Sequence, residues 1–224
     1  MLVEEGTRWL HTGGIFAGLS EDTAAVAEEA MAAARRAGVV VSYDLNFRPS
    51  LWKSVGGAAR AVEINRKLVG LTDVLFGNEE DFSAALGFEV AGTDESFSTL
   101  EGEAYAKMLH SVTAAFPDLR VVATSLRRVH SASSNDWGGI CWAAGEIHST
   151  GMTERVEILD RVGGGDSFAS GLIYGLLSGM EPALALRYGV AHGALAMTTP
   201  GDTSMATLDE VRRLVEGGSA RVVR

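Results

Sequence analysis

The sequence predicts an α/β protein with a mostly parallel sheet, and three observations lead to this fold class. Short apolar or β-branched runs alternate with helical patterns along the 224 residues, as in strands joined by crossover helices. The composition, with 46% hydrophobic and 21% charged residues, is that of a globular protein with a sizeable core. Polar groups gather where four of the expected strands end, which is where ligands bind in such sheets.

The expected elements alternate between strand and helix, beginning with a strand over 8–11. A helix over 21–37 follows; it opens with Glu21 and Asp22, carries Arg35 and Arg36 in its last turn and stops at Gly38. Further strands are expected over 39–43, 74–76, 120–124 and 156–159, with a hairpin over 140–143 and 146–149 around the turn at 144–145. Further helices are expected over 58–69, 79–86, 167–178, 183–197 and 208–215. Because no linker rich in proline or serine divides the chain, residues 1–224 are expected to form a single domain.

Charge and composition exclude several classes of function. The net charge of −10 repels polyanions, and basic residues cluster no further than pairs, so nucleic acid is not an expected partner. The longest apolar run, 168–180, is too short to span a bilayer, and the N-terminus lacks the pattern of a signal peptide. Cys141, the single cysteine, cannot form an internal disulfide. These features predict a cytoplasmic protein without a membrane partner.

The segment DRVGGGDSF, residues 160–168, is the strongest candidate for chemistry. Gly163, Gly164 and Gly165 have no Cβ, so the backbone there can take positive φ and approach a ligand closely. The helix that follows points unpaired N–H groups at the same place, which favours an anion such as a phosphate. Asp166 beside this turn can accept the proton of a hydroxyl as its bond to phosphorus forms. The alternative is a tight turn in which Asp166 serves only as a helix cap.

This segment, extended to DRVGGGDSFASGLIYGLLSG, resembles the D-T-x-G-A-G-D signature of the ribokinase-like (PfkB-type) carbohydrate kinases. The resemblance implies that the glycine turn is the anion hole and that Asp166 is the catalytic base. Arg161 stands where threonine is usual, and Gly164 stands where alanine is usual. YDLNFRPSLW, NEEDF and SLRRVHSASSNDW, in this order, are most similar to 2-keto-3-deoxygluconate kinases. The match therefore implies a three-layer α/β/α ribokinase-like fold over most of the chain.

The resemblance also implies two substrate-binding residues. Arg48, in the DxNxR loop, would contact the acid sugar, and a guanidinium fork suits a carboxylate. Asp202, in TTPGDT, falls in a segment whose aspartate helps to hold the substrate. The alternatives are a surface arginine ahead of Pro49 and an ordinary turn at PGD.

Nucleotide and metal contacts are implied at three further places. Asn46 and Phe47 would lie near the nucleotide phosphates, as would Ser125 and Arg127 in a loop after a strand. The N-x-x-E element of the Mg²⁺ and phosphate network corresponds to Asn78 and Asp81, with aspartate in place of the usual glutamate. Glu80 could substitute for it, or NEED could be no more than an acidic helix start.

The expected function is therefore an ATP-dependent kinase, using Mg²⁺, that phosphorylates a hydroxyl of 2-keto-3-deoxygluconate or a related sugar acid. The alternatives are another PfkB-type sugar kinase, such as a fructokinase or a ribokinase-like enzyme, and an inactive nucleotide-binding fragment of the same fold. A serine hydrolase using Ser167 is a more remote alternative, because GDSFA comes within one residue of G-x-S-x-G and His192 follows as a base.

Members of this family are longer at the N-terminus, where they carry the first strands, a small β lid and a glycine-rich sugar-binding segment. This chain is expected to lack them. A lid excludes water and orients the attacking hydroxyl, so its absence bears on sugar phosphorylation more than on nucleotide binding. The absent strands are expected to leave an exposed sheet edge, which allows a homo-oligomer.

Overall fold

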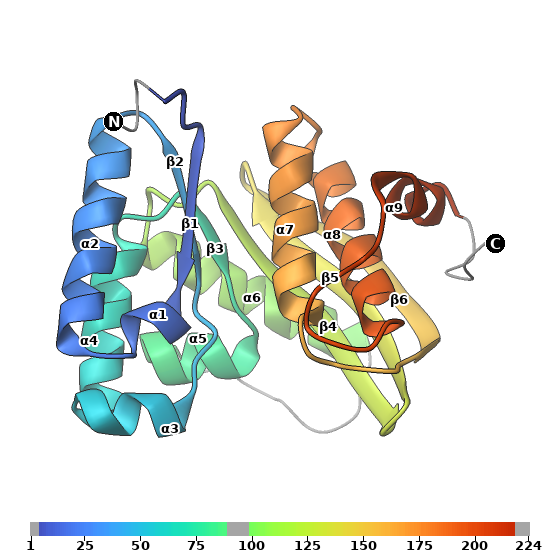
Figure 1. Ribbon diagram of the computed structural model, residues 1–224, viewed down its shortest axis with the longest axis horizontal. Helices are drawn as coiled ribbons and strands as arrows, with labels where there is room; N and C mark the ends of the chain where they lie inside the picture. Colours follow the sequence, from blue (N-terminus) through green and yellow to red (C-terminus); the bar gives the residue numbers. More distant parts are fainter. Residues whose placement is uncertain (1–4, 89–98, 218–224) are drawn as a thin grey trace. The chain divides into compact units, whose positions relative to one another are not determined.

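The computed structural model describes residues 5–88 and 99–217. The chain divides into two compact units, Met1–Thr124 and Ser125–Arg224, and strand β4 (Val121–Ser131) runs across their boundary (Figure 1). This division leaves the single-domain prediction untested. Within the described ranges, no helix combines the length and the apolar character that a bilayer crossing requires.

The strands of the first unit pair in parallel, as the sequence predicts. They are β1 (Trp9–Gly13), β2 (Val40–Asp44), β3 (Val74–Phe76) and the start of β4. Trp9 lies opposite Val40, Ser42 opposite Val74, and Val74 opposite Val121, so β1, β2 and β3 all end at one edge, which β4 continues past. The loops that leave this edge carry the polar residues noted in the sequence.

Two long helices of the first unit, α2 (Glu21–Arg36) and α4 (Gly57–Val69), lie side by side (Figure 1). A buried polar pair joins α4 to the sheet: Tyr43 donates a 2.8 Å hydrogen bond to Oδ1 of Asn65, whose amide donates to the carbonyl of Ala61. Burial raises the pKa of Tyr43, so its hydroxyl stays protonated and remains a donor. The remaining helices of this unit are α1 (Gly14–Ala17), α3 (Pro49–Trp52), the short 3₁₀ helix η1 (Lys53–Val55), α5 (Glu79–Leu86) and α6 (Thr99–Ala115).

The second unit combines an antiparallel hairpin with three helices. The hairpin consists of β5 (Ser134–Ala143) and β6 (Glu146–Glu157), joined by Ala144 and Gly145, both with positive φ. The helices are α7 (Gly164–Leu177), α8 (Pro182–Met197) and α9 (Leu208–Val215). Helices α7 and α8 lie side by side (Figure 1), and a Cβ added at Gly175 would come within 2.6 Å of the Cα of Ala185. This contact requires glycine, because the two backbones approach too closely for any side chain.

Most predicted elements are confirmed within a few residues, but several differ. The short helices α1, α3 and η1 and the long helix α6 were not predicted. Strand β5 begins at Ser134, six residues before the predicted start, and β6 continues to Glu157, so the strand expected separately over 156–159 is largely the end of β6. Strand β4 continues to Ser131, so the prediction of a loop at Ser125 and Arg127 is wrong: the polar run 127–131 is a largely exposed strand. Helix α7 begins at Gly164, three residues before the predicted start. The glycine turn therefore feeds directly into the first helical turn.

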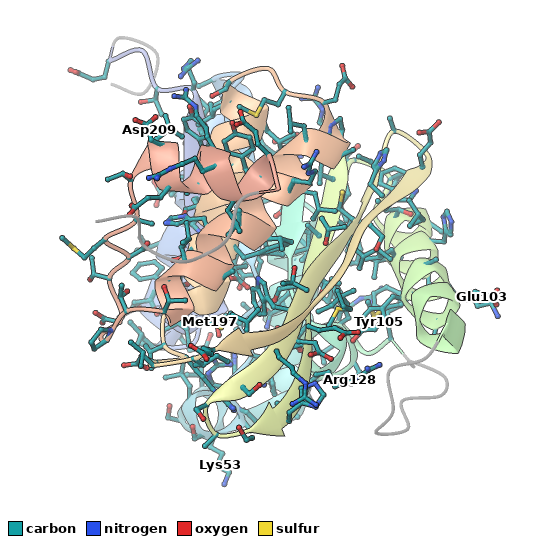
Figure 2. All side chains as sticks on the ribbon, turned by 90° about the vertical axis from the view of Figure 1, so that its right-hand side faces the viewer. Lys53, Glu103, Tyr105, Arg128, Met197 and Asp209 are labelled. Atoms are coloured by element: carbon teal, nitrogen blue, oxygen red, sulfur yellow. The ribbon has the colours of Figure 1, made fainter. Side chains whose placement is uncertain are left out.

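A buried carboxylate, that of Asp136, holds the hairpin region of the second unit together. Its Oδ1 accepts hydrogen bonds from the main-chain N–H of Arg155 at 2.9 Å and from Nε2 of His130 at 2.7 Å. Arg128 of β4, labelled in Figure 2, places its guanidinium 3.6 Å from Oδ2. The side chain of Asp136 is 4% exposed. The bond from Arg155, followed by those of His130 and the charge of Arg128, holds the pKa of Asp136 below its ordinary value.

We expect Asp136→Asn to lower the free energy of unfolding by about 2 kcal/mol at neutral pH, as is typical for hydrogen bonds to a charged group. The pKa of Asp136 is lower in the folded protein than in the unfolded chain. The stabilisation is therefore present above the unfolded-state pKa, near 4 for aspartate, and is lost as the pH falls through the folded-state pKa. Urea unfolding at several pH values should show the difference between natural and variant proteins shrinking below about pH 4. Glu146→Gln, an exposed change on β6, is the control. A difference that is unchanged at about pH 3 would contradict the prediction.

Candidate functional site

The predicted site residues divide between the two units. Five of them belong to the first unit and follow the ends of β2 and β3, on a loop or at the start of α5: Asn46, Phe47, Arg48, Asn78 and Asp81. The others belong to the second unit: Ser125, Arg127, Gly163, Gly164, Gly165, Asp166 and Asp202.

The loop after β2 has a tightly specified backbone. Leu45 is fully buried and extends the strand pairing by one residue, through a 2.9 Å bond from its N–H to the carbonyl of Phe76. Asn46 then takes φ +33°, a left-handed conformation that is uncommon for residues other than glycine. Its N–H donates to Oδ1 of Asp44 at 3.2 Å. This turn redirects the chain at the end of the strand, so that Phe47 is buried and Arg48 is exposed.

Asp81 is held at the start of α5 by a capping box. Oδ1 of Asn78 accepts a hydrogen bond from the N–H of Asp81 at 2.8 Å, and Oδ2 of Asp81 accepts one from the N–H of Asn78 at 2.9 Å. The other oxygen, Oδ1, accepts a 2.7 Å bond from the N–H of Phe47. Asp81 is 5% exposed. Burial raises its pKa, while the two main-chain bonds and the nearby charge of Arg48 act in the opposite direction.

The oxygens of Asn78 and Asp81 fit direct ligation of a metal poorly. The amide oxygen of Asn78 and both carboxylate oxygens of Asp81 already accept main-chain N–H groups, and the carboxylate is buried. Across residues 5–88 and 99–217, no three or more His, Cys, Asp or Glu side chains gather in a way that could hold a metal ion. The assignment of Mg²⁺ to these two residues stays a prediction.

Arg48 is exposed and precedes the first residue of α3, Pro49. One of its guanidinium nitrogens, Nη1, donates a 2.9 Å bond to the carbonyl of Phe47. A guanidinium carries five N–H donors, so this bond orients the side chain and leaves donors for an anionic group.

The three glycines at the start of α7 have different surroundings. Gly163, the N-cap, has φ +81°, and a Cβ there would overlap the main-chain carbonyl of Asp202. Gly164 is buried, and its Cβ would come within 3.1 Å of Cγ of Met197, which Figure 2 labels at the end of α8. Gly165 is exposed, and a Cβ there would meet no atom within 4 Å. The turn is thus packed on one side and open on the other.

Asp166 is exposed in the first turn of α7, where main-chain N–H groups have no partners within the helix. The positive end of the helix dipole favours a bound anion at this place. The contact of Gly163 with Asp202 brings a second predicted residue, also exposed, to the same turn. Ser125, half-buried, and Arg127, exposed, lie on β4.

Two residues that sequence reasoning assigned no role hold the signature segment in place. Asp160 accepts the N–H of Val162 at 3.0 Å and the N–H of Gly201 at 3.1 Å, and these bonds lower its pKa. It thereby joins the glycine turn to the loop that carries Asp202. Arg161 donates from Nη2 to the carbonyls of Ser131 and Ala132, at 2.6 and 3.2 Å, and to Oδ1 of Asn135 at 3.2 Å. One feature of the sequence indicates such a role: arginine stands at position 161, where threonine is usual in the family signature.

The geometry around Ser167 is not that of a hydrolase nucleophile. Ser167 is 6% exposed within α7, and its N–H donates to the carbonyl of Gly163. The ring nitrogens of His192 lie 3.0 Å from Oγ of Ser170 and 2.9 Å from Oγ of Ser204. Burial lowers the pKa of His192, as expected of a ring packed among helices. His192 thus ties the loop after α8 to α7.

A cavity of about 230 Å³ lies between α2 and α4 of the first unit, and none of the predicted site residues lines it. Two ion pairs join α4 to α2 across it, Arg60 with Glu21 and Lys67 with Glu28, and Arg60 also pairs with Glu63 on its own helix. It is a groove between packed helices whose charged side chains neutralise one another.

Comparison with known proteins gives a consistent result. The chain matches the pfkB carbohydrate kinase family over residues 5–208. It is 30% identical over 223 residues to the 2-dehydro-3-deoxygalactonokinase of Haloferax volcanii, and covers 61% of that protein. It is 28% identical over 200 residues to the 2-dehydro-3-deoxygluconokinase of Bacillus subtilis, and covers 51% of that one. The chain therefore spans between half and two thirds of the length of these relatives.

A solved structure agrees with the sequence matches. The crystal structure of 2-dehydro-3-deoxygluconokinase from Thermotoga maritima superposes with a TM-score of 0.86 at 34% identity, over 96% of this chain and 62% of that one. The fructokinase of Xylella fastidiosa, solved with bound ATP, superposes with a TM-score of 0.60 at 25% identity, over 94% of this chain and 62% of that one. The predicted ribokinase-like α/β fold is confirmed. Because the family match extends over nearly the whole chain, the chain belongs to the pfkB family of carbohydrate kinases.

Proposed function

We propose that this chain carries the catalytic part of an ATP-dependent kinase that phosphorylates a hydroxyl of 2-keto-3-deoxygluconate or a related sugar acid. The names of the relatives support the substrate class, since they are kinases of dehydro-deoxy sugar acids. The observation that carries the proposal is the open glycine turn at the start of α7, with Asp166 exposed in its first turn and Asp202 against Gly163.

In this proposal Asp166 accepts the proton of the substrate hydroxyl as the new O–P bond forms and the bond from the γ-phosphorus to ADP breaks. A carboxylate is too weak a base to ionise a free alcohol, so proton transfer accompanies phosphoryl transfer. The N–H groups of Gly163 to Gly165, with the dipole of α7, stabilise the negative charge on the transferring group. Because the turn is held by Asp160 and by the loop around Asp202, these donors are fixed before the reaction begins.

The remaining residues bind the two substrates. Arg48 forms a forked contact with the carboxylate of the sugar acid, and Asp202 accepts from a sugar hydroxyl. The nucleotide phosphates lie near Asn46, Phe47, Ser125 and Arg127. Mg²⁺ bound together with ATP would be held chiefly by phosphate oxygens and water, since the oxygens of Asn78 and Asp81 already accept main-chain bonds.

The setting of the enzyme is also part of the proposal. The single cysteine is buried and free, which suits a reducing compartment such as the cytoplasm. The partners are a small sugar acid and ATP, and a homo-oligomer stays a prediction.

Two other functions stay open because the chain spans only part of its relatives. One is phosphorylation of a different sugar by the same fold; the other is nucleotide binding without turnover. Titration calorimetry with ATP and Mg²⁺, together with a coupled assay over keto-deoxy acids, fructose and ribose, separates them. Binding of ATP without turnover would favour a protein that only binds nucleotide. If no nucleotide binds, the kinase proposal is wrong.

We expect Asp166→Asn to lower kcat by about 10²- to 10⁴-fold, the usual contribution of a general base, because the amide cannot accept the proton. Binding of ATP should change by less than about threefold, since the variant retains the glycine turn. Asp209→Asn, an exposed acid in the first turn of α9, is the matched control. Retention of most of the phosphorylation rate by the Asp166 variant would rule out Asp166 as the base.

We expect Arg48→Lys to raise KM for the sugar acid about 10- to 100-fold, because a single ammonium cannot reproduce a forked, charge-assisted contact. For a sugar without a carboxylate, KM should be nearly unchanged. Steady-state kinetics with both sugars measures the contrast, and Arg36→Lys at the exposed end of α2 is the control. Equal effects on both sugars would contradict the assignment of Arg48 to the carboxylate.

A further inference from the structure

The carboxylate of Asp81 joins two backbone segments that are distant in the sequence. Oδ2 accepts the N–H of Asn78, three residues away, and Oδ1 accepts the N–H of Phe47, 34 residues away. Both bonds are short, at 2.9 and 2.7 Å, and the side chain is 5% exposed. Bonds of this kind to a buried charge are the strong ones among protein hydrogen bonds.

Helix capping accounts for only one of these bonds. The capping box of α9 is closed by Oε2 of Glu210, which accepts from the N–H of Thr207 on the exposed surface. The box of α2 is closed by the hydroxyl of Thr23, which accepts from the N–H of Ser20. One acceptor atom therefore suffices to close a capping box in this chain. The second oxygen of Asp81 serves the loop after β2.

That loop is the one that presents Arg48. Asp44 accepts the N–H of Asn46 and Asp81 accepts the N–H of Phe47, so carboxylates hold two successive amides around a left-handed residue. The carbonyl of Phe47 in turn accepts from Nη1 of Arg48. A continuous path thus runs from Asp81 through Phe47 to the guanidinium of Arg48.

From this path we infer that Asp81 is a positioning residue: its carboxylate fixes the loop of residues 46–48 and thereby aims Arg48 at the carboxylate of a sugar acid, and it does not ligate a metal. The part of the inference that concerns the substrate of Arg48 rests on the proposed function. The part that concerns the bond from Phe47 to Asp81 does not. A glutamate, one methylene longer, could not keep both short bonds without moving the loop or α5. The aspartate therefore suits this particular arrangement.

The sharpest test is Asp81→Thr, because Thr23 demonstrates that a threonine can close a capping box in this chain. The variant keeps an acceptor for Asn78 and lacks the second oxygen for Phe47. Amide hydrogen exchange followed by NMR, on the full chain without ligands, is expected to be about tenfold or more faster at Phe47 and within about threefold at Asn78. Glu210→Thr is the matched control, in which neither amide should change.

Steady-state kinetics provides a second test, because a residue that only stabilised the fold would not change KM for the sugar acid selectively. In Asp81→Thr, KM for the sugar acid should rise about tenfold, while KM for ATP and the Mg²⁺ concentration for half-maximal rate stay within about twofold. Adding Arg48→Lys should then raise KM by less than the product of the two single effects, since both changes act on one contact.

Three results would overturn the inference: unchanged exchange at Phe47, a shift of about tenfold or more in the Mg²⁺ requirement, or additive effects with Arg48→Lys. If Asp81→Thr does not fold, Asp81→Asn keeps the shape of the side chain but offers one acceptor, and the same exchange measurement applies. If the natural chain phosphorylates no sugar acid, the proposed function fails, yet exchange at Phe47 still decides whether Asp81 holds the loop.

Discussion

Carboxylates that accept main-chain N–H groups stabilise the backbone of both units, in loops and in strands. Asp73 accepts the N–H of Val41 at 2.8 Å, and Asp81, Asp136 and Asp160 bond main-chain amides in the same way. A main-chain amide that bonds no carbonyl of the sheet needs another acceptor, whether it lies in a loop, as at Phe47, or within a strand, as at Val41 and Arg155. An ionised side chain accepts such an amide more strongly than a neutral one. Part of the acidic composition is therefore structural.

Asp160 and Asp166 belong to the same segment but differ, among the described residues, in whether their carboxylates accept main-chain amides. Both oxygens of Asp160 accept main-chain amides, so it fixes the turn and the loop carrying Asp202. Asp166, six residues on, lies exposed in the first helical turn. A base must change its bonding during the reaction, whereas an anchor must not, so the exposure of Asp166 is compatible with the base proposed for it and the two main-chain bonds of Asp160 are those of an anchor.

Features encoded in a few neighbouring residues could be predicted from the sequence. Helices α5 and α9 have the bounds expected of them, and each begins with a local capping box. The extent of β4 and the partners of Asp81 and Arg161 could not be predicted, because they depend on residues brought together by folding. Phe47 and Asp81 are 34 residues apart, and Arg161 and Ser131 are 30 apart. The glycine turn could be predicted from the sequence, but its packing against Asp202 and Met197 could not.

The surrounding structure accommodates the departures from the family pattern to different degrees. Arg161, in place of threonine, donates to one oxygen each of Ser131, Ala132 and Asn135, where β4 turns into β5. Asp81, in place of glutamate, bonds two amides at short distance. Gly164, in place of alanine, faces Met197, where a Cβ would come within 3.1 Å of Cγ. Asp81 and Gly164 are therefore matched by their neighbours. Arg161 is matched only in part, because its Nε and the Nδ2 of Asn135 are buried without a hydrogen-bond partner among the described residues. A buried donor without a partner lowers stability, so the arginine at this position is the least well accommodated of the three departures.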